Sequence, residues 1–222
     1  SMGAGWAFAA VVLATFAALA GTDLWAAVAE PSACAMTYMR PSYYAVPVKS
    51  WSPPSAGAGY RLLHYRERAP AGLTAGRALA DVQGTPVLFL PGNAGSYKQV
   101  RSLASETARL GGPRLAWFAA DFGEHISAFD GGVLDAQSAF ATVALTRLSD
   151  LMEAQGLTDR GVIVVAHSMG AVVARNALAR APAALAAQVH TFVALAGPLA
   201  GHPFLAQPSL ARTYYSAAAL AL

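Results

Sequence analysis

At 222 residues, the chain is long enough for one domain with a sizeable core, or for a domain plus a membrane segment. Its net charge of +3 comes from scattered Arg residues, which argues against a nucleic-acid-binding surface. Its single cysteine, Cys34, excludes an internal disulfide and a Cys-rich metal site. The composition is 55% hydrophobic and only 12% charged, which is unusually apolar for a soluble domain and predicts contact with lipid.

The first long segment, residues 3–21, carries no charged side chain (GAGWAFAAVVLATFAALAG). A helix that crosses a bilayer needs roughly 20 apolar residues, so this length favours an N-terminal transmembrane helix or signal anchor. The competing interpretation is a cleaved secretory signal peptide, whose apolar region is usually shorter and preceded by positive charge. Under either interpretation the domain that follows enters the secretory pathway.

Residues 22–59 form a predicted luminal juxtamembrane segment. It contains a stretch rich in Tyr and Met and a loop rich in Pro, Ser and Gly, as expected of a linker packed against the domain or the lipid interface. Residues 60–222 are then expected to form a separate folded domain. This region opens with YRLLHYR (60–66), which is typical of an edge strand and would leave His64 on the surface.

A buried strand is predicted at residues 85–90 (TPVLFL), followed by the turn PGNAGS and a helix over 97–110. A turn after an early strand of a parallel sheet can supply one of the two backbone donors that bind an oxyanion. By its position, the backbone N–H of Asn93 is the candidate donor. A Gly-rich turn can also bind phosphate, but the Gly-Lys-Ser/Thr of a nucleotide site does not follow it.

Acidic and imidazole side chains follow the next predicted strand, residues 114–120 (RLAWFAA). Asp121, Glu124, His125 and Asp130 lie close together in the loop that comes after it. Such a group could bind a metal or a polar headgroup, but a loop of this composition is more often simply solvated. We therefore predict no metal site and no cofactor.

The segment GVIVVAHSMGAVVAR (161–175) joins a short β-branched run directly to a helical sequence, with Ser168 at the junction. Strand, Ser between small residues, and helix are together typical of the nucleophile elbow of an α/β-hydrolase, although small-x-Ser-x-small also arises by chance in an Ala-rich chain. Small residues at Ala166 and Gly170 are needed because the turn is tight. We predict that Ser168 is the catalytic nucleophile and that the backbone N–H of Met169 is the second oxyanion donor.

Two further elements complete the predicted sheet. An amphipathic helix over residues 134–155 leads into the elbow strand, and another strand follows at residues 189–196 (VHTFVALA), with His190 at the end away from the site. Alternating strands and helices specify a doubly wound, mostly parallel sheet with right-handed crossovers. Residues 60–222 are therefore predicted to form a partial α/β-hydrolase domain. The predicted fold class is α/β and α/β-hydrolase-like, with a sheet that is incomplete at its C-terminal side, and with an N-terminal transmembrane helix.

Four stretches resemble one family closely. They are CAMTYMRPSYY (34–44), VLFLPGNAGSYKQVRSLAS (87–105), ADFGEHISAFDGGVLDAQ (120–137) and VIVVAHSMGAVVAR (162–175). On these residues the chain is identified as a member of the GPI inositol-deacylases, which are membrane-anchored α/β-hydrolases of the endoplasmic reticulum.

The resemblance implies a serine ester hydrolase, with the family's nucleophile at Ser168. Such enzymes remove the acyl chain from the inositol of GPI-anchored proteins and so promote protein transport out of the endoplasmic reticulum. The implied partners are GPI-anchored proteins or GPI lipid as substrate, together with membrane lipid, and no nucleic acid. The implied location is the endoplasmic reticulum membrane, with the hydrolase domain luminal.

The remaining members of a catalytic triad are not apparent in the sequence. A hydrolase of this fold places an acid and then a His after its nucleophile, but no Asp or Glu follows Ser168. Members of the family tend to have a His after the Pro that follows the last strand, and an Asp shortly afterwards, where this chain has Leu199 and Gln207. We therefore expect the triad acid and His beyond Leu222, so that this chain alone is catalytically incomplete.

Two other functions remain open. A general lipase or carboxylesterase would explain the elbow but not the detailed matches in the other three stretches. A non-catalytic, membrane-bound relic of the fold would bind lipid without turning it over. Labelling of Ser168 by a fluorophosphonate separates both kinds of enzyme from the relic.

Overall fold

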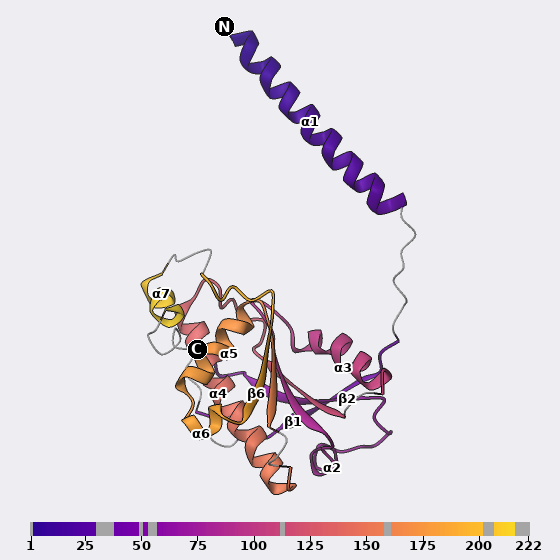
Figure 1. Ribbon diagram of the computed structural model, residues 1–222, viewed down its shortest axis with the longest axis vertical. Coiled ribbons are helices and arrows are strands. Elements are labelled where there is room, and N and C mark those ends of the chain that lie inside the picture. Colours follow the sequence, from indigo (N-terminus) through magenta and orange to yellow (C-terminus); the bar gives the residue numbers. More distant parts are fainter. Residues whose placement is uncertain are drawn as a thin grey trace. The chain divides into compact units, whose positions relative to one another are not determined.

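The computed structural model describes residues 2–29, 38–48, 51–52, 57–111, 114–157, 161–201 and 207–215 (Figure 1). The chain divides into two units, residues 1–38 and 39–222. Cys34 and Leu222, which were named above, lie outside the described part.

The first unit contains one helix, α1 (Met2–Ala29), so the helix predicted over residues 3–21 is present. Its hydroxyl groups are satisfied within the helix, because Thr15 Oγ1 donates to the carbonyl of Val11 and Thr22 Oγ1 to that of Leu19, each at 2.8 Å. Of the residues that the structure describes, no helix combines the length and hydropathy that a membrane span requires, so a spanning role for residues 3–21 stays a prediction.

The second unit is built on a six-stranded sheet in the order β1-β2-β4-β3-β5-β6. Its strands are β1 (Pro41–Val46), β2 (Arg61–Glu67), β3 (Thr85–Leu90), β4 (Leu115–Asp121), β5 (Val162–His167) and β6 (Val189–Leu195). Strands β4, β3, β5 and β6 are parallel, whereas β1 and β2 are antiparallel to their neighbours. The mostly parallel α/β sheet is therefore confirmed.

Helices cover both faces of this sheet (Figure 1). The helices of this unit are α2 (Ala75–Ala80), the 3₁₀ turn η2 (Tyr97–Gln99), α3 (Val100–Arg109), α4 (Gly131–Ala154), α5 (Met169–Arg180), α6 (Ala183–Ala186) and α7 (Pro208–Tyr214). Helix α3 packs on one face, and α4 and α5 pack on the other. Because neighbouring parallel strands need crossovers, this two-sided cover follows from the alternation of strands and helices in the sequence.

The central strands are apolar on both faces because both faces are buried. In β3, Val87 and Phe89 pack into the core beneath α3, while Leu88 and Leu90 pack into the core beneath α4 and α5. The four β3 side chains are at most 2% exposed, and burying each contributes about 1.5–3 kcal/mol.

Helix α4 starts three residues earlier than the apolar pattern predicted. The Oδ1 atom of Asp130 accepts hydrogen bonds from the N–H groups of Gly132 at 2.7 Å and Val133 at 3.2 Å, so Asp130 caps the helix. The apolar stripe predicted along this helix is confirmed, since Phe140, Ala144, Leu148 and Leu151 are all buried.

Strand β2 is not an edge strand, and the surface position predicted for His64 is wrong. Strand β1, which lies in the segment predicted to be juxtamembrane, pairs with residues 62–67 of β2 and places Tyr44 opposite His64. The sheet therefore continues past β2, and His64 is only 2% exposed.

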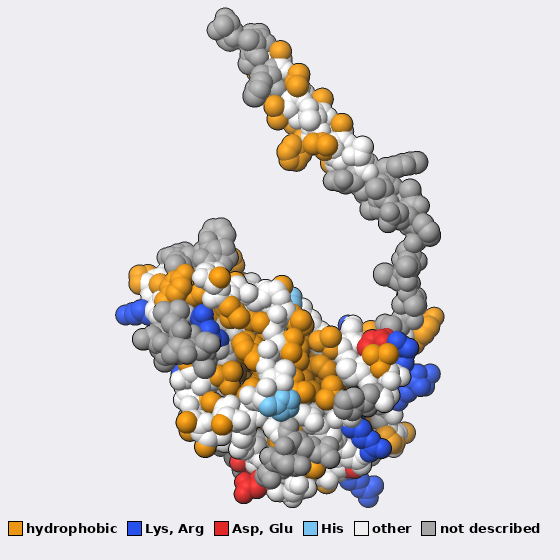
Figure 2. Space-filling model, in the orientation of Figure 1, with side chains coloured by type: hydrophobic (Ala, Val, Ile, Leu, Met, Phe, Trp, Pro, Cys, Tyr) orange, Lys and Arg blue, Asp and Glu red, His pale blue; other side chains and the backbone are white. Residues whose placement is uncertain are grey.

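The opposite margin of the sheet is β6, which is the outermost strand among the described residues. Apolar side chains gather over this region of the surface (Figure 2), and Val193 and Leu195 are each more than one third exposed.

Candidate active site

Ser168 occupies a strained turn between β5 and α5. Its φ of 52° and ψ of −125° are unusual for any residue other than glycine, and such a conformation costs about 1–3 kcal/mol. The surrounding structure holds it there, because Ser168 N–H donates to the carbonyl of Leu195 at 2.8 Å and Ser168 C=O accepts from the N–H of Ala171 at 3.0 Å. The strand–turn–helix arrangement predicted around Ser168 is therefore present.

The small residues on either side of Ser168 permit close packing. A Cβ atom added to Gly170 would lie 2.3 Å from the carbonyl oxygen of Leu90 and 2.7 Å from that of Pro91. Ala166 is fully buried in β5. The start of α5 thus rests directly against the end of β3, which brings the turn that follows β3 close to Ser168.

The turn after β3 approaches the nucleophile at Gly92. A Cβ atom at this position would lie 2.8 Å from the Cβ of Ser168 and 3.3 Å from its Oγ. The same turn is held tightly, since Gly95 N–H donates to the carbonyl of Gly92 at 3.0 Å. The backbone of the PGNAGS turn therefore forms one wall beside the Ser168 hydroxyl.

Two backbone N–H groups near Ser168 are available for an oxyanion. Met169 is the first residue of α5, and Asn93 follows Gly92 in the adjoining turn. Within the described residues, neither N–H donates to an acceptor. The N-terminus of α5 also carries a partial positive charge, which favours an oxyanion beside Met169.

A second loop braces the turn that carries Asn93. The N–H of Ala128 donates to the side-chain Oδ1 of Asn93 at 2.8 Å, and the N–H of Ala94 donates to the carbonyl of His125 at 3.1 Å. Neither loop alone reveals this link in the sequence, because it joins loops about 35 residues apart. The Asn side chain thus fixes the conformation of the turn and leaves its own backbone N–H free.

The acidic and imidazole residues of the loop after β4 have separate structural roles. The Asp121 carboxylate is ion-paired with Arg61 and accepts from Gly123 N–H at 3.1 Å, while Asp130 caps α4. The ring of His125 is hydrogen-bonded through Nδ1 to the hydroxyl of Tyr60 at 3.2 Å, and burial raises the pKa of that phenol to about 12. In the part of the chain that the structure describes, no three His, Cys, Asp or Glu side chains gather to hold a metal.

The surroundings of the Ser168 hydroxyl contain no paired base among the described residues. Neither a His ring nor a carboxylate within them hydrogen-bonds to the Ser168 hydroxyl. His190 lies near the start of β6, whereas the elbow lies at the other end of the parallel sheet, as predicted. Members of the family tend to have a His and an Asp where this chain has Leu199 and Gln207. The carbonyl of Leu199 accepts a hydrogen bond from Arg175. The side-chain oxygen of Gln207 accepts one from the N–H of Gly131.

The chain is similar to known proteins over most of its length. Residues 81–220 match the family model described as a PGAP1-like alpha/beta domain. A GPI inositol-deacylase from Neurospora crassa is 34% identical over 83% of this chain, and one from Drosophila melanogaster is 34% identical over 77%. The matched regions make up 16% and 17% of those proteins, so the chain spans less than a fifth of the length of these curated relatives.

Solved structures resemble this chain more distantly. A putative carboxylesterase from Lactobacillus plantarum has a TM-score of 0.48 and 12% sequence identity, with 82% of this chain and 70% of that chain covered. A likeness of this degree carries no information about activity.

Proposed function

We propose, because this chain belongs to the family of PGAP1-like α/β domains, that it carries the nucleophile of a serine ester hydrolase. The observation that supports this most directly is the backbone of Ser168, which has a strained, positive φ and immediately precedes the first residue of α5. The substrate is the acyl chain on the inositol of GPI-anchored proteins or GPI lipid, since the similar proteins from Neurospora crassa and Drosophila melanogaster are GPI inositol-deacylases.

The reaction proceeds by acyl transfer to Ser168. The Oγ atom attacks the acyl carbonyl carbon, its proton passes to a His base, and the N–H groups of Asn93 and Met169 hold the negative charge on the carbonyl oxygen. The inositol oxygen then leaves with that proton, and the acyl group remains on Ser168. Water attacks the acyl-enzyme in the same way and releases the fatty acid.

Labelling and turnover test the catalytic role of Ser168. The whole enzyme that contains this domain is treated with a fluorophosphonate, and the modified residue is identified by mass spectrometry. We expect modification at Ser168, loss of modification in Ser168→Ala, and unchanged modification in the exposed control Ser102→Ala. If that folded enzyme is modified elsewhere, or not at all, the result would contradict the assignment and favour a non-catalytic relic.

The substrate is tested separately with an inositol-acylated GPI-anchored reporter. Release of free fatty acid, measured by mass spectrometry, should require Ser168 in the enzyme that contains this domain. Hydrolysis of simple esters without release from the reporter would instead support a general carboxylesterase.

The proposed location is the endoplasmic reticulum membrane, with the hydrolase domain luminal and residues 3–21 as the attachment. The uncharged sequence of that segment and a lipid-linked substrate support the proposal. There, deacylation would promote transport of GPI-anchored proteins. Carbonate extraction of the expressed chain checks it, because a chain that appears in the soluble fraction, with a new N-terminus after about residue 21, would have a cleaved signal.

A further inference from the structure

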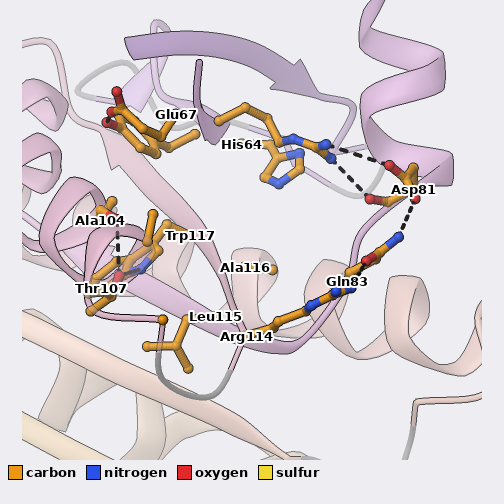
Figure 3. Close-up of a pocket in the computed structure, with 14 residues that line it drawn as sticks. His64, Glu67, Asp81, Gln83, Ala104, Thr107, Arg114, Leu115, Ala116 and Trp117 are labelled. Atoms are coloured by element: carbon orange, nitrogen blue, oxygen red, sulfur yellow. Dashed lines mark hydrogen bonds and ion pairs between the residues drawn. The ribbon is translucent and has the colours of Figure 1, made fainter. Parts of the chain in front are cut away.

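The cavity drawn in Figure 3 lies at the end of the sheet opposite Ser168. It has a volume of about 500 Å³, and its lining includes Gln83, which precedes β3, and Leu115, which begins β4. Strands β3, β4 and β5 are parallel, and Ser168 follows the last residue of β5. Side chains that contact the acyl chain of an ester at Ser168 must therefore be sought at the other end of the sheet, in the loops beside the nucleophile.

The loop after β4 presents two large apolar side chains to solvent. Ile126 is 53% exposed and Phe129 is 52% exposed, whereas Ser127 between them is fully buried. The exposure of Val193 and Leu195 follows from their place on β6, the outermost strand among the described residues. Strand β4 lies inside the sheet, between β2 and β3, so a position at the sheet margin does not explain the exposure of Ile126 and Phe129.

This loop adjoins the nucleophile through the turn after β3. The N–H of Ala128, which lies between the two exposed side chains, donates to the Oδ1 of Asn93 at 2.8 Å. Gly92, the residue before Asn93, comes so close to Ser168 that a Cβ added to it would lie 3.3 Å from the Ser168 Oγ. The exposed apolar side chains and the proposed oxyanion donor therefore belong to two loops that are hydrogen-bonded to each other.

Contacts on both sides restrain the loop. Near its start, the carbonyl of His125 accepts from the N–H of Ala94 at 3.1 Å. At its end, the N–H of Gly131 donates to the Oε1 of Gln207 at 3.3 Å. A Cβ added to Gly131 would lie 2.5 Å from the backbone N of Leu210, so α7 packs directly against this end of the loop. The two side chains are thus carried on a restrained backbone, and a ligand that contacts them need not order the loop.

The charges around the loop favour an alkyl chain that arrives with the substrate over the surface of a bilayer. Residues 115–146 contain four acidic side chains and no Lys or Arg. Protein segments that lie on membranes usually carry Lys or Arg, which anionic lipids attract. Acidic side chains repel lipid phosphates instead. An alkyl chain is uncharged, and its contact with Ile126 and Phe129 removes apolar surface from water.

We propose that Ile126 and Phe129 bind the acyl chain of the ester that Ser168 cleaves and give the enzyme a preference for long chains. The proposal rests on the proposed function, which places the acyl carbonyl carbon at Ser168 Oγ and its oxygen at the N–H of Asn93. The chain attached to that carbon extends along the adjoining loop and covers the two apolar side chains. Ile126 and Phe129 determine specificity and take no part in the chemical steps.

Two esters of different chain length test the proposal in the whole enzyme that contains this domain. The value of kcat/KM is measured for p-nitrophenyl octanoate and p-nitrophenyl acetate, and the ratio of the two values is compared between variants. Ile126→Ser and Phe129→Ser should each lower this ratio about tenfold, the lower end of the effect of one methylene in an apolar pocket, because both side chains are half-exposed. A variant that only harms folding lowers both values equally and leaves the ratio unchanged.

A conservative variant and a distant one are the controls. Phe129→Leu keeps an apolar side chain and should retain most of the preference for octanoate. Leu110→Ser changes a side chain that is 69% exposed between α3 and β4, at the other end of the sheet, and should leave the ratio unchanged.

Three results would overturn the proposal. An unchanged ratio in both Ile126→Ser and Phe129→Ser would remove the acyl-chain site while leaving Ser168 as the nucleophile. A fall in the ratio that occurs with the enzyme in phosphatidylcholine vesicles, but not in detergent, would assign the loop to the bilayer instead. Failure of the wild type to hydrolyse either ester by way of Ser168 would refute the proposed function, and the acyl-chain site with it.

Discussion

Gly170 gives the sharpest test of the elbow geometry. A methyl group at this position would lie 2.3 Å from the carbonyl oxygen of Leu90, 2.7 Å from that of Pro91 and 2.9 Å from the carbonyl carbon of Leu90. All three are backbone atoms at the end of β3, so none can rotate away, and α5 must move off the sheet. Overpacking costs about 1–3 kcal/mol, and contacts this short place Gly170→Ala at the upper end, about 3 kcal/mol.

Thermal unfolding of the 222-residue chain measures the effect. A loss of about 3 kcal/mol lowers the melting temperature of a domain this size by roughly 6–12 °C. Gly76→Ala is the matched control, because Gly76 lies in helix α2 with no atom within 4 Å of the added Cβ. That control should be neutral or more stable by up to about 1 kcal/mol. A Gly170→Ala melting temperature within about 2 °C of the wild type would refute the close approach of α5 and β3 and the overpacking argument.

Three further predictions concern stability. Ser168→Gly should be about 1 kcal/mol more stable than Ser168→Ala in urea unfolding, because only glycine relieves the positive φ, and equal stabilities would argue against strain at the elbow. His64 has its pKa lowered to about 4 chiefly by burial, so between about pH 6.5 and 4 the unfolded chain binds the proton and the folded chain does not. The unfolding free energy should therefore fall by up to about 3 kcal/mol as pH drops across that window, and His64→Phe should flatten this part of the profile. Arg175→Met should lower the free energy of unfolding in urea by about 2–3 kcal/mol, because the buried guanidinium donates to the carbonyl of Tyr214 and lies 4.9 Å from the Tyr214 ring. An unchanged urea midpoint would show that this contact does not hold α7 in place.

The central strands were predictable because burial on both faces leaves a continuous apolar run. Strand β3 has the predicted bounds, β6 ends one residue before its predicted end, and β5 contains the β-branched run 162–165 and continues for two more residues. The strand–turn–helix at Ser168 was predictable for a local reason, since the small residues that a tight turn requires are adjacent in sequence. These features depend on residues within a few positions of one another.

The features that prediction missed depend on partners far apart in the sequence. Strand β1 begins with Pro41 and reads as a linker, and it is a strand only because β2 is there to pair with it. The burial of His64 follows from the same pairing. The link from Asn93 to Ala128 could not be read from either loop alone, because an Asn in a Gly-rich turn usually bonds within its own turn.

The position of β3 between β4 and β5 has a consequence for synthesis of the chain. Strand β4 follows soon after β3, but roughly 75 residues separate β3 from β5, its other neighbour, which takes about 4–15 s at 5–20 residues per second. Throughout that interval, the edge of β3 that will pair with β5 has been synthesised but has no partner strand. Folding factors that act during synthesis would meet this domain with its sheet only partly formed. Slow codons between β4 and β5 would prolong its exposure to aggregation more than slow codons after β5.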